Sequence, residues 1–185
     1  MNHDRLPPLA PDQWSAEQRT CAEEIIAGPR GAVIEPFIPM LRSPELCTHA
    51  QRMGEYLRYR SAIGLRLSEL AILLTARHWN QQVEWAIHAP IAMREGITRA
   101  VVDAISERRD PPYERADERL VDAVVRQSLN DRRVADDTWQ QGVAALGEQG
   151  VIDLLGIAGY YTMLSFVMTG AQTPPPRGLD MRLAP

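Results

Sequence analysis

The segment of residues 66–96 constrains the fold of this chain more than any other part. Its apolar residues recur three and four positions apart, which is the spacing of one face of an α-helix. The pattern predicts two helices joined by a turn near Asn80. If the second helix folds back on the first, Glu69 from the first helix meets Glu84 and His88 from the second. The sequence therefore predicts a cluster of three ionisable side chains between two helices.

Three neighbouring residues complete this prediction. The hydroxyl of Ser68 is suited to cap the first helix, which we expect to span residues 69–79. Gln81 lies on the same stripe of the second helix as the cluster. His78 lies on the opposite face of the first helix, so we do not expect it to join the other ionisable groups.

The flanks of Glu84 and His88 are apolar, which predicts that both side chains are partly removed from water. Buried carboxylates and imidazoles need partners, and such groups have displaced pKa values that suit general acid–base chemistry. Two alternatives remain open. The pair at positions i and i+4 can simply stabilise a helix, or it can chelate a metal with Glu69 as third ligand. Because the other histidines lie elsewhere, we expect no metal.

The rest of the sequence predicts further helices and no alternating strand pattern. Helix-capping residues, glycines and prolines mark the expected ends. The expected helices span residues 15–27, 43–59, 98–107, 116–129, 136–146 and 151–169. The prediction is a single all-α domain over residues 1–185, with an extended arm at 1–13 and an extended tail at 171–185.

Composition limits the possible partners. The chain has a formal net charge of −4, and its basic residues form no long cluster, which argues against nucleic acid and against anionic membranes. The apolar run at 151–169 approaches the length of a membrane span, but it contains Asp153 and has no basic flank. We therefore expect a buried helix there and no membrane partner.

The two cysteines and the N-terminal residues favour a cytoplasmic location. Cys21 and Cys47 lie far apart and form no CxxC motif, so the sequence predicts neither a disulfide framework nor a catalytic thiol. The first residues contain no apolar stretch typical of a secretory signal.

One loop outside the central segment adds a candidate binding residue. Gly28-Pro-Arg-Gly31 places Arg30 between residues that fix the backbone. Its guanidinium can point inward to bind an oxygen of a substrate, although an arginine facing solvent is the commoner arrangement.

The central motifs resemble the carboxymuconolactone decarboxylase family of the alkylhydroperoxidase-D-like superfamily. The resemblance rests on Glu69-Leu-Ala-Ile-Leu, Ala76-Arg-His-Trp-Asn-Gln and Glu84-Trp-Ala-Ile-His88, and its core covers residues 44–107. It implies a bundle of helical hairpins that is an obligate homo-oligomer, a trimer or hexamer, with sites near subunit contacts.

The resemblance also implies which chemistry to expect. Peroxidases of that superfamily use a CxxC before the histidine, and here Gln81 and Glu84 stand at the two cysteine positions. Thiol peroxidase activity is therefore not expected, and the decarboxylase branch is favoured. Its members need no cofactor, because the conjugated carbonyl of a lactone acid can accept the electron pair that remains when CO2 leaves.

The sequence-based hypothesis is a carboxy-lyase in aromatic compound catabolism that acts on a small molecule such as 4-carboxymuconolactone. His88 would donate the proton, Glu84 would orient it, and Glu69 would act as a relay or second base. Gln81 or Arg30 would hold a substrate oxygen, and Trp85 would line the pocket. A hydrolase or isomerase reaction on the same scaffold, and a non-catalytic helical oligomer, remain alternatives.

Overall fold

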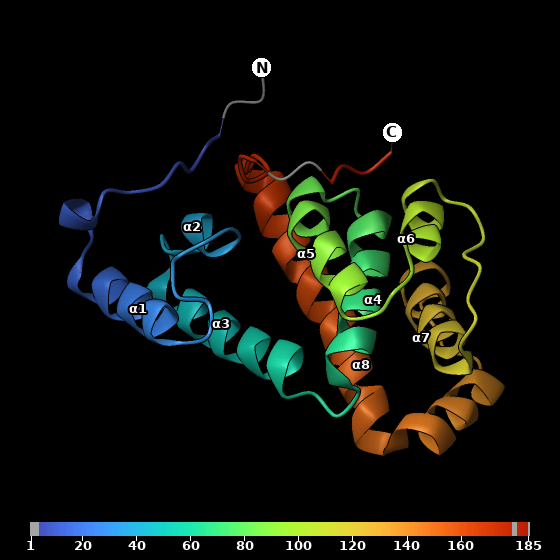
Figure 1. Cartoon of the computed structure of the whole chain (residues 1–185). Helices are drawn as coiled ribbons and strands as arrows, with labels where there is room; N and C mark the ends of the chain where they lie inside the picture. Colours follow the sequence, from blue (N-terminus) through green and yellow to red (C-terminus); the bar gives the residue numbers. More distant parts are fainter. Residues whose placement is uncertain (1–3, 179–180, 185) are drawn as a thin grey trace.

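Helices form most of the described part of the chain, which is residues 4–178 and 181–184 of a computed structural model (Figure 1). Within these residues there is no strand, so the predicted all-α class is confirmed. The α-helices are α1 (Ala16–Ala27), α2 (Phe37–Met40), α3 (Pro44–Tyr59), α4 (Gly64–His78), α5 (Gln82–Arg94), α6 (Arg99–Ser106), α7 (Ala116–Arg126) and α8 (Asp136–Ala171).

Helices α4 and α8 form the centre of the molecule. Helix α4 packs against α3, α5, α6, α7 and α8, and every residue from Leu67 to Arg77 on it is buried. Helix α8 runs beside it and also contacts α2, α3 and α7. Figure 1 shows α1, α2 and α3 on one side of this centre and α6 and α7 on the other. Side chains on two opposite sides of α4 are therefore enclosed by different neighbours.

The turn between α4 and α5 lies where the sequence predicts it. Asn80 adopts a left-handed conformation with φ of 50°, which asparagine tolerates better than most residues. The side chain of Gln81 then accepts a hydrogen bond from the backbone of Val83 and caps α5. The chain reverses within three residues, and α5 returns along α4.

The predicted start of α4 at Ser68 is wrong. The helix begins one turn earlier, at Gly64, whose φ of 74° only glycine adopts without strain. Asp153 of α8 accepts a hydrogen bond from the backbone of Ala62 at 2.8 Å and so fixes the turn before the helix. Ser68 is buried inside α4 and shares a hydrogen bond with Ser61 instead.

Helix α8 consists of two helical parts with a break at Gly147. Gly147 has φ of 72° and ψ of 167°, which is not a helical conformation. The predicted stop after Leu146 is thus confirmed, but Gly150 lies inside the second part. Helix α8 is long and apolar enough to span a membrane by length and composition alone, although 56% of its most apolar window is buried in the chain.

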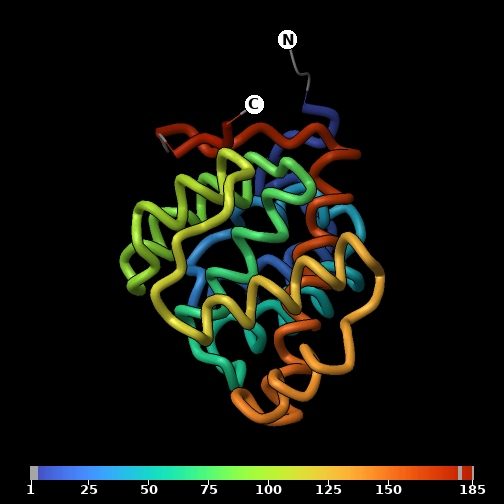
Figure 2. The backbone as a smooth tube through the Cα atoms, turned by 90° about the vertical axis from the view of Figure 1, so that its right-hand side faces the viewer, coloured from blue at the N-terminus to red at the C-terminus, as the bar shows by residue number. Residues whose placement is uncertain are grey.

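The described parts of the arm and the tail lie at the same end of the molecule, as Figure 2 shows. The arm is extended except for a short 3-10 helix, Pro11–Gln13. In the tail, Leu183 is buried, and the backbone of Ala184 accepts a hydrogen bond from Arg77 at 2.9 Å. The extended tail therefore packs on the chain's own helices.

Candidate active site

His88 is held by two carboxylates, one from each helix of the central pair. Its Nδ1 donates a hydrogen bond to Glu69 Oε2 at 2.6 Å, across from α5 to α4. Its Nε2 lies 3.3 Å from Glu84 Oε2, one turn back on the same helix. All three side chains are buried. The structure therefore brings together the three residues predicted to converge.

Arg58 of α3 completes the support of Glu69. Its Nε donates to Glu69 Oε1 at 3.3 Å, so the two oxygens of this carboxylate bind two different cationic partners. The Arg58 side chain is 15% exposed, whereas that of Glu69 is fully buried. The buried carboxylate of Glu69 on α4 is thus an ionic centre: its ion pairs join α4 to α3 and α5 inside the core.

These contacts displace the pKa values of both partners. Burial alone would lower the pKa of His88, but the negative charge of Glu69, its hydrogen bond and the contact with Glu84 raise that pKa above its ordinary value. Burial alone would raise the pKa of Glu69, but the charges and hydrogen bonds of His88 and Arg58 lower it. The arrangement therefore favours the charged forms of both groups, a protonated His88 beside an ionised Glu69.

A small cavity of about 20 Å³ lies beside His88. Its walls come from the segment 28–36, α2, α3, α5 and α8, and Glu84 lines it while Glu69 lies behind His88. A cavity of this size holds about one water molecule. The site is therefore closed to larger molecules in this conformation.

Two buried oxygens in the cavity wall have no hydrogen-bond partner among the described residues. They are Glu84 Oε1 and the hydroxyl of Tyr160. A buried polar atom without a partner costs free energy, so such atoms usually mark a place where water or a ligand binds. Both atoms are available to a bound molecule.

Arg30 points inward, as the first of its two predicted arrangements requires. Its guanidinium donates to the side chain of Gln51 at 3.3 Å and to the backbone oxygen of Gln51 at 3.1 Å, and it lies 4.7 Å from the ring centre of Phe37. It contacts no carboxylate among the described residues. The cavity therefore has one guanidinium whose charge is not paired.

Two tyrosines of α8 close the cavity opposite His88. The ring of Tyr161 packs edge-on against His88, with the ring centres 5.2 Å apart. Burial, together with the charges of Glu84 and Glu69, raises the pKa of Tyr161 well above its ordinary value. Burial also raises the pKa of Tyr160. Both phenols therefore keep their protons at neutral pH.

Gln81 and Trp85, two predicted binding residues, do not line this cavity. The amide nitrogen of Gln81 lies 3.5 Å from the backbone oxygen of Ser165 and 3.4 Å from the hydroxyl of Thr169, so its contacts are with α8. Trp85 is fully buried, and its Nε1 has no partner among the described residues. In this conformation both residues serve the packing of α5.

His78 lies outside the cluster, as its place on α4 predicts. Its Nδ1 donates to Asn130 Oδ1 at 3.1 Å on the far side of the helix. The described His, Cys, Asp and Glu side chains include no group of three or more arranged to hold a metal ion. Cys21 and Cys47 are buried free thiols, and burial raises the pKa of Cys47, which makes it a poor nucleophile.

The sequence analysis missed Arg58, Glu35 and the two tyrosines as cavity residues. Arg58 lies eleven positions before Glu69 on another helix, and Tyr160 lies more than seventy positions after Glu84, so no local spacing connects them. One signal was present in the sequence: an adjacent pair of tyrosines within the otherwise apolar run of α8.

The comparisons with known proteins assign no family. The chain matches none of the protein-family models searched, and a search of curated proteins finds no match either. The functional argument therefore rests on the geometry of the site.

Proposed function

We propose that this chain is a cofactor-independent lyase that decarboxylates a small lactone or oxo acid resembling 4-carboxymuconolactone. The observation that carries the proposal is the bonding of His88 to Glu69 and Glu84 at a buried cavity that also contains an unpaired arginine. This arrangement supplies a charged proton donor, fixed in position, beside a group that binds carboxylates. The resemblance of the central motifs to the carboxymuconolactone decarboxylase family points to the same reaction.

Arg30 is the proposed carboxylate-binding group. Its planar guanidinium suits a bidentate contact with a carboxylate, and its present partners are the neutral oxygens of Gln51. With His88 protonated, the cations Arg30, Arg58 and His88 balance the carboxylates of Glu35, Glu69 and Glu84. An incoming carboxylate adds negative charge, which keeps the proton on His88 until the reaction begins.

The reaction needs two steps. First, the bond between the substrate carboxylate and its neighbouring carbon breaks, CO2 leaves, and the electron pair moves into the conjugated carbonyl to form an enolate. Second, His88 gives its proton to the carbon that lost CO2. The neutral phenol of Tyr160, whose hydroxyl has no partner among the described residues, is placed to donate a hydrogen bond to the enolate oxygen.

The two carboxylates have different parts in this proposal. Glu69, at 2.6 Å from Nδ1, holds the imidazole in place and favours its charged form; it is a positioning residue because it lies behind His88. Glu84 lines the cavity, and one of its oxygens is free to accept the solvent proton that the overall reaction consumes, so that the carboxyl group can pass it to Nε2. His88 thus regains its proton after each turnover.

Access to the cavity requires movement of the segment 28–36. This segment carries Arg30 and supplies Ile34, Glu35 and Pro36 to the wall, and the cavity of about 20 Å³ is too small for a lactone acid. We propose that the segment opens to admit the substrate and closes over it with Arg30 on the carboxylate. Closure then excludes water, which strengthens the electrostatic contacts in the site.

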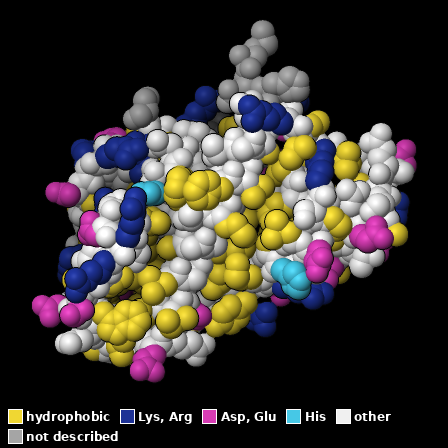
Figure 3. All heavy atoms as spheres, turned by 180° about the vertical axis from the view of Figure 1, so that it is seen from behind, with side chains coloured by type: hydrophobic (Ala, Val, Ile, Leu, Met, Phe, Trp, Pro, Cys, Tyr) yellow, Lys and Arg dark blue, Asp and Glu magenta, His cyan; other side chains and the backbone are white. Residues whose placement is uncertain are grey.

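We also propose that the chain forms a homo-oligomer of alkylhydroperoxidase-D-like bundles, a trimer or hexamer. The support is apolar surface on α8, where Ile152 and Phe166 are each 60% exposed. Figure 3 shows hydrophobic side chains gathered across the centre of the face opposite that of Figure 1. Side chains of this size are seldom left in water in such a group unless another surface covers them.

An absorbance assay tests the proposed activity. Purified chain is mixed with 4-carboxymuconolactone, and loss of its ultraviolet absorbance is followed for the unmodified chain, His88→Gln and the control His49→Gln. His49 is exposed on α3 and does not line the cavity. We expect turnover by the unmodified chain and the control, and a loss of at least about 100-fold in His88→Gln.

The same experiment separates catalysis from a structural role. A His88→Gln chain that keeps its helical circular dichroism but loses turnover supports the proposal. Turnover retained in a folded His88→Gln chain would contradict it. If the unmodified chain also fails with this and other small lactone and oxo acids, the cluster serves stability alone, and the proposed function is wrong.

A further inference from the structure

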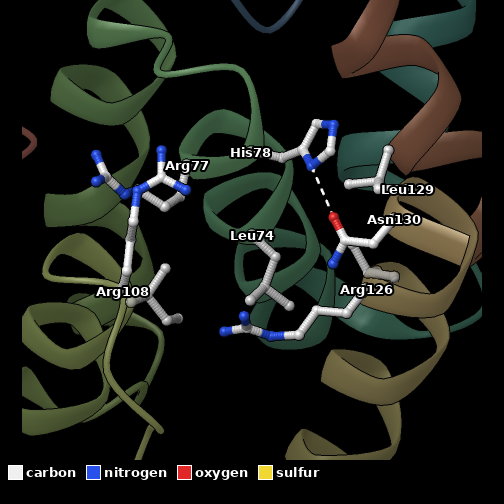
Figure 4. Close-up of a pocket in the computed structure, with 9 residues that line it drawn as sticks. Leu74, Arg77, His78, Arg108, Arg126, Leu129 and Asn130 are labelled. Carbon is white, nitrogen blue, oxygen red and sulfur yellow. Dashed lines mark hydrogen bonds between the residues drawn. The ribbon is translucent and has the colours of Figure 1, made fainter.

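A second polar cavity of about 110 Å³ lies on the other side of α4 (Figure 4). It is lined from the last turn of α4, the end of α6, the last turn of α7 and the π-helical turn that follows α7, Gln127–Asp131 (η2). It shares no lining residue with the cavity beside His88. The three arginines Arg77, Arg108 and Arg126 line it together with His78, and no aspartate or glutamate does.

Arg77 is an unusual arginine because it is almost fully buried and has no acidic partner among the residues that the structure describes. The residue is 6% exposed, and its Nη1 donates to the backbone oxygen of Ala184 at 2.9 Å. Its Nε is buried and has no hydrogen-bond partner among the described residues. Burial, and then the charge of Arg108, lower the pKa of Arg77.

Arg108 lies next to Arg77 and likewise has no acidic partner in the described part of the chain. Figure 4 shows the two guanidinium groups side by side at one edge of the cavity. Arg108 donates to Asn80 Oδ1 at 2.8 Å, a neutral oxygen, and neither arginine takes part in an ion pair within the described chain. Two adjacent guanidinium groups repel each other, so their placement in one cavity is unfavourable until an anion binds.

The remaining polar groups are already partnered. Arg126 donates to Asp122 at 2.7 Å, so its charge is compensated. His78 donates through Nδ1 to Asn130, which leaves its Nε2 available. Within the described chain, the cavity charges without an acidic partner are therefore those of Arg77 and Arg108.

Stabilisation of helix ends does not account for this arrangement. Basic side chains near a helix C-terminus interact favourably with the helix dipole, and Arg77 and Arg126 do lie in the last turns of α4 and α7. That effect operates at the surface and needs neither a buried guanidinium nor a second one beside it. Arg108 belongs to no helix, and its φ of 57° is a conformation that few residues other than glycine adopt readily.

We propose that this cavity binds a small oxyanion, a carboxylate or a phosphate group, between the guanidinium groups of Arg77 and Arg108. Each guanidinium offers a planar pair of donors that matches the geometry of such a group, and the free Nε of Arg77 is one of these donors. The site is independent of the proposed lyase activity, because it shares no lining residue with the cavity beside His88.

The apolar part of the cavity lining indicates an organic anion in preference to a bare ion. Leu74, Ile105 and Val125 are buried apolar residues that line the cavity together with the arginines. An anion with a short carbon chain would place that chain against them while its charged group contacts the guanidinium groups. The adjoining π-helical turn supports a ligand site, since such turns occur frequently at functional positions.

Calorimetric titration of the full chain tests the proposal. The probes are inorganic phosphate and glutarate, each added at a constant ionic strength of about 0.15 M so that general screening does not change. The test variants are Arg108→Gln and Arg77→Lys, which keeps the buried charge but loses the paired donors. The matched control is Arg109→Gln, because Arg109 is 58% exposed, adjacent in sequence and paired with Glu107.

We expect saturable binding of at least one probe, a Kd raised roughly tenfold or more by each test variant, and a change below about twofold in the control. Binding of phosphate alone would identify a phosphate-type ligand, and binding of glutarate alone a carboxylate ligand. Either result supports the site. The proposal is overturned if neither probe binds with a Kd below about 10 mM, or if Arg109→Gln weakens binding as much as Arg108→Gln.

Discussion

The charge of His88 determines what the central cluster can do. A protonated imidazole donates from Nδ1 to Glu69 and holds its positive charge with Nε2 3.3 Å from Glu84, and both contacts favour the charged form. A neutral imidazole would lose one of them. The cluster can therefore donate a proton only while His88 is charged, and the fraction of charged His88 depends on pH.

The first prediction concerns this pH dependence. The pKa of His88 is raised, so its stabilising contribution is complete below the ordinary value of 6.5 and is lost as pH rises through the raised value. The pKa of Glu69 is lowered, so its contribution is complete above the ordinary value of 4.5 and is lost as pH falls through the lowered value. The pair should stabilise the fold most between pH 4.5 and 6.5.

Thermal unfolding of the chain and of His88→Gln over pH 4 to 9 measures this contribution. The difference in Tm between the two should be largest within that interval and should shrink above it. A difference that stays constant, or grows as the solution becomes alkaline, would show that His88 is not held in its charged form.

The second prediction concerns the removal of Glu69. Glu69→Ala leaves His88 and Arg58 buried without their shared anion, and breaking a buried ion pair in this way costs about 3–5 kcal/mol. Urea denaturation should give a loss of that size. The control Glu107→Ala removes an exposed partner of Arg109 and should cost less than about 1 kcal/mol. Equal losses in both variants would refute the buried ionic centre.

The sequence predicts only the members of this cluster that lie close together along the chain. Glu84 and His88 share a helix face through their spacing, and the turn at Asn80 brings Glu69 to them. Arg58 joins from α3 through tertiary packing, which no local periodicity encodes. Gln81 failed as a cavity residue for a local reason: its side chain is used to cap α5.

At the scale of elements, α3 and α8 approach closely at one glycine. A Cβ atom added to Gly54 would lie 2.2 Å from the hydroxyl oxygen of Tyr160. Tyr160 forms part of the cavity wall, so the missing side chain at Gly54 is what allows its ring to lie there. The packing of these two helices and the shape of the site are therefore coupled.

The third prediction follows from that contact. Gly54→Ala must displace the Tyr160 ring or separate the helices, which should lower the free energy of unfolding by about 1–3 kcal/mol and also reduce turnover. The matched control is Gly170→Ala on α8, where an added Cβ meets nothing within 4 Å. That change should be neutral or stabilising by up to about 1 kcal/mol. A stable, fully active Gly54→Ala chain would contradict the coupling.

The first residue of a helix could be predicted where a side chain next to it caps the helix. It could not be predicted where a residue of another element fixes the start of the helix. Ser15 with Gln18 and Thr98 cap α1 and α6 as expected. The start of α4 depends on Asp153, which is ninety-one residues away from the backbone group that it binds. Ser68 had the right chemistry for a cap, but the helix had already begun.

At the scale of the whole molecule, the exposed apolar surface of α8 gives the fourth prediction. If Ile152 and Phe166 are covered by another copy of the chain, analytical ultracentrifugation should show a trimer or hexamer. Phe166→Asp should dissociate it into folded smaller species. Ile26→Asp, a similar change at a half-exposed residue of α1, should not. A monomer at all concentrations would disprove the assembly.

The all-α class follows from periodicity along the whole chain, but the substrate and the assembly do not. Both depend on surfaces formed by residues far apart in sequence, such as the wall that joins Arg30 to Tyr160. The same holds for the second cavity, where Arg77 comes from α4 and Arg108 from the loop after α6. Helical spacing predicts which face of a helix is buried but not which neighbour covers it.

The most direct test of the central claim is an NMR titration of nitrogen-15-labelled histidines in the intact chain. At pH 7, His88 should give the signals of a doubly protonated imidazole and should lose its proton only at a pH above the ordinary value of 6.5. In Glu69→Gln the pKa of His88 should fall, because the charge and hydrogen bond that raise it are lost. A neutral His88 at pH 7, or a pKa that does not respond to Glu69→Gln, would contradict the account of this site as a charged proton donor.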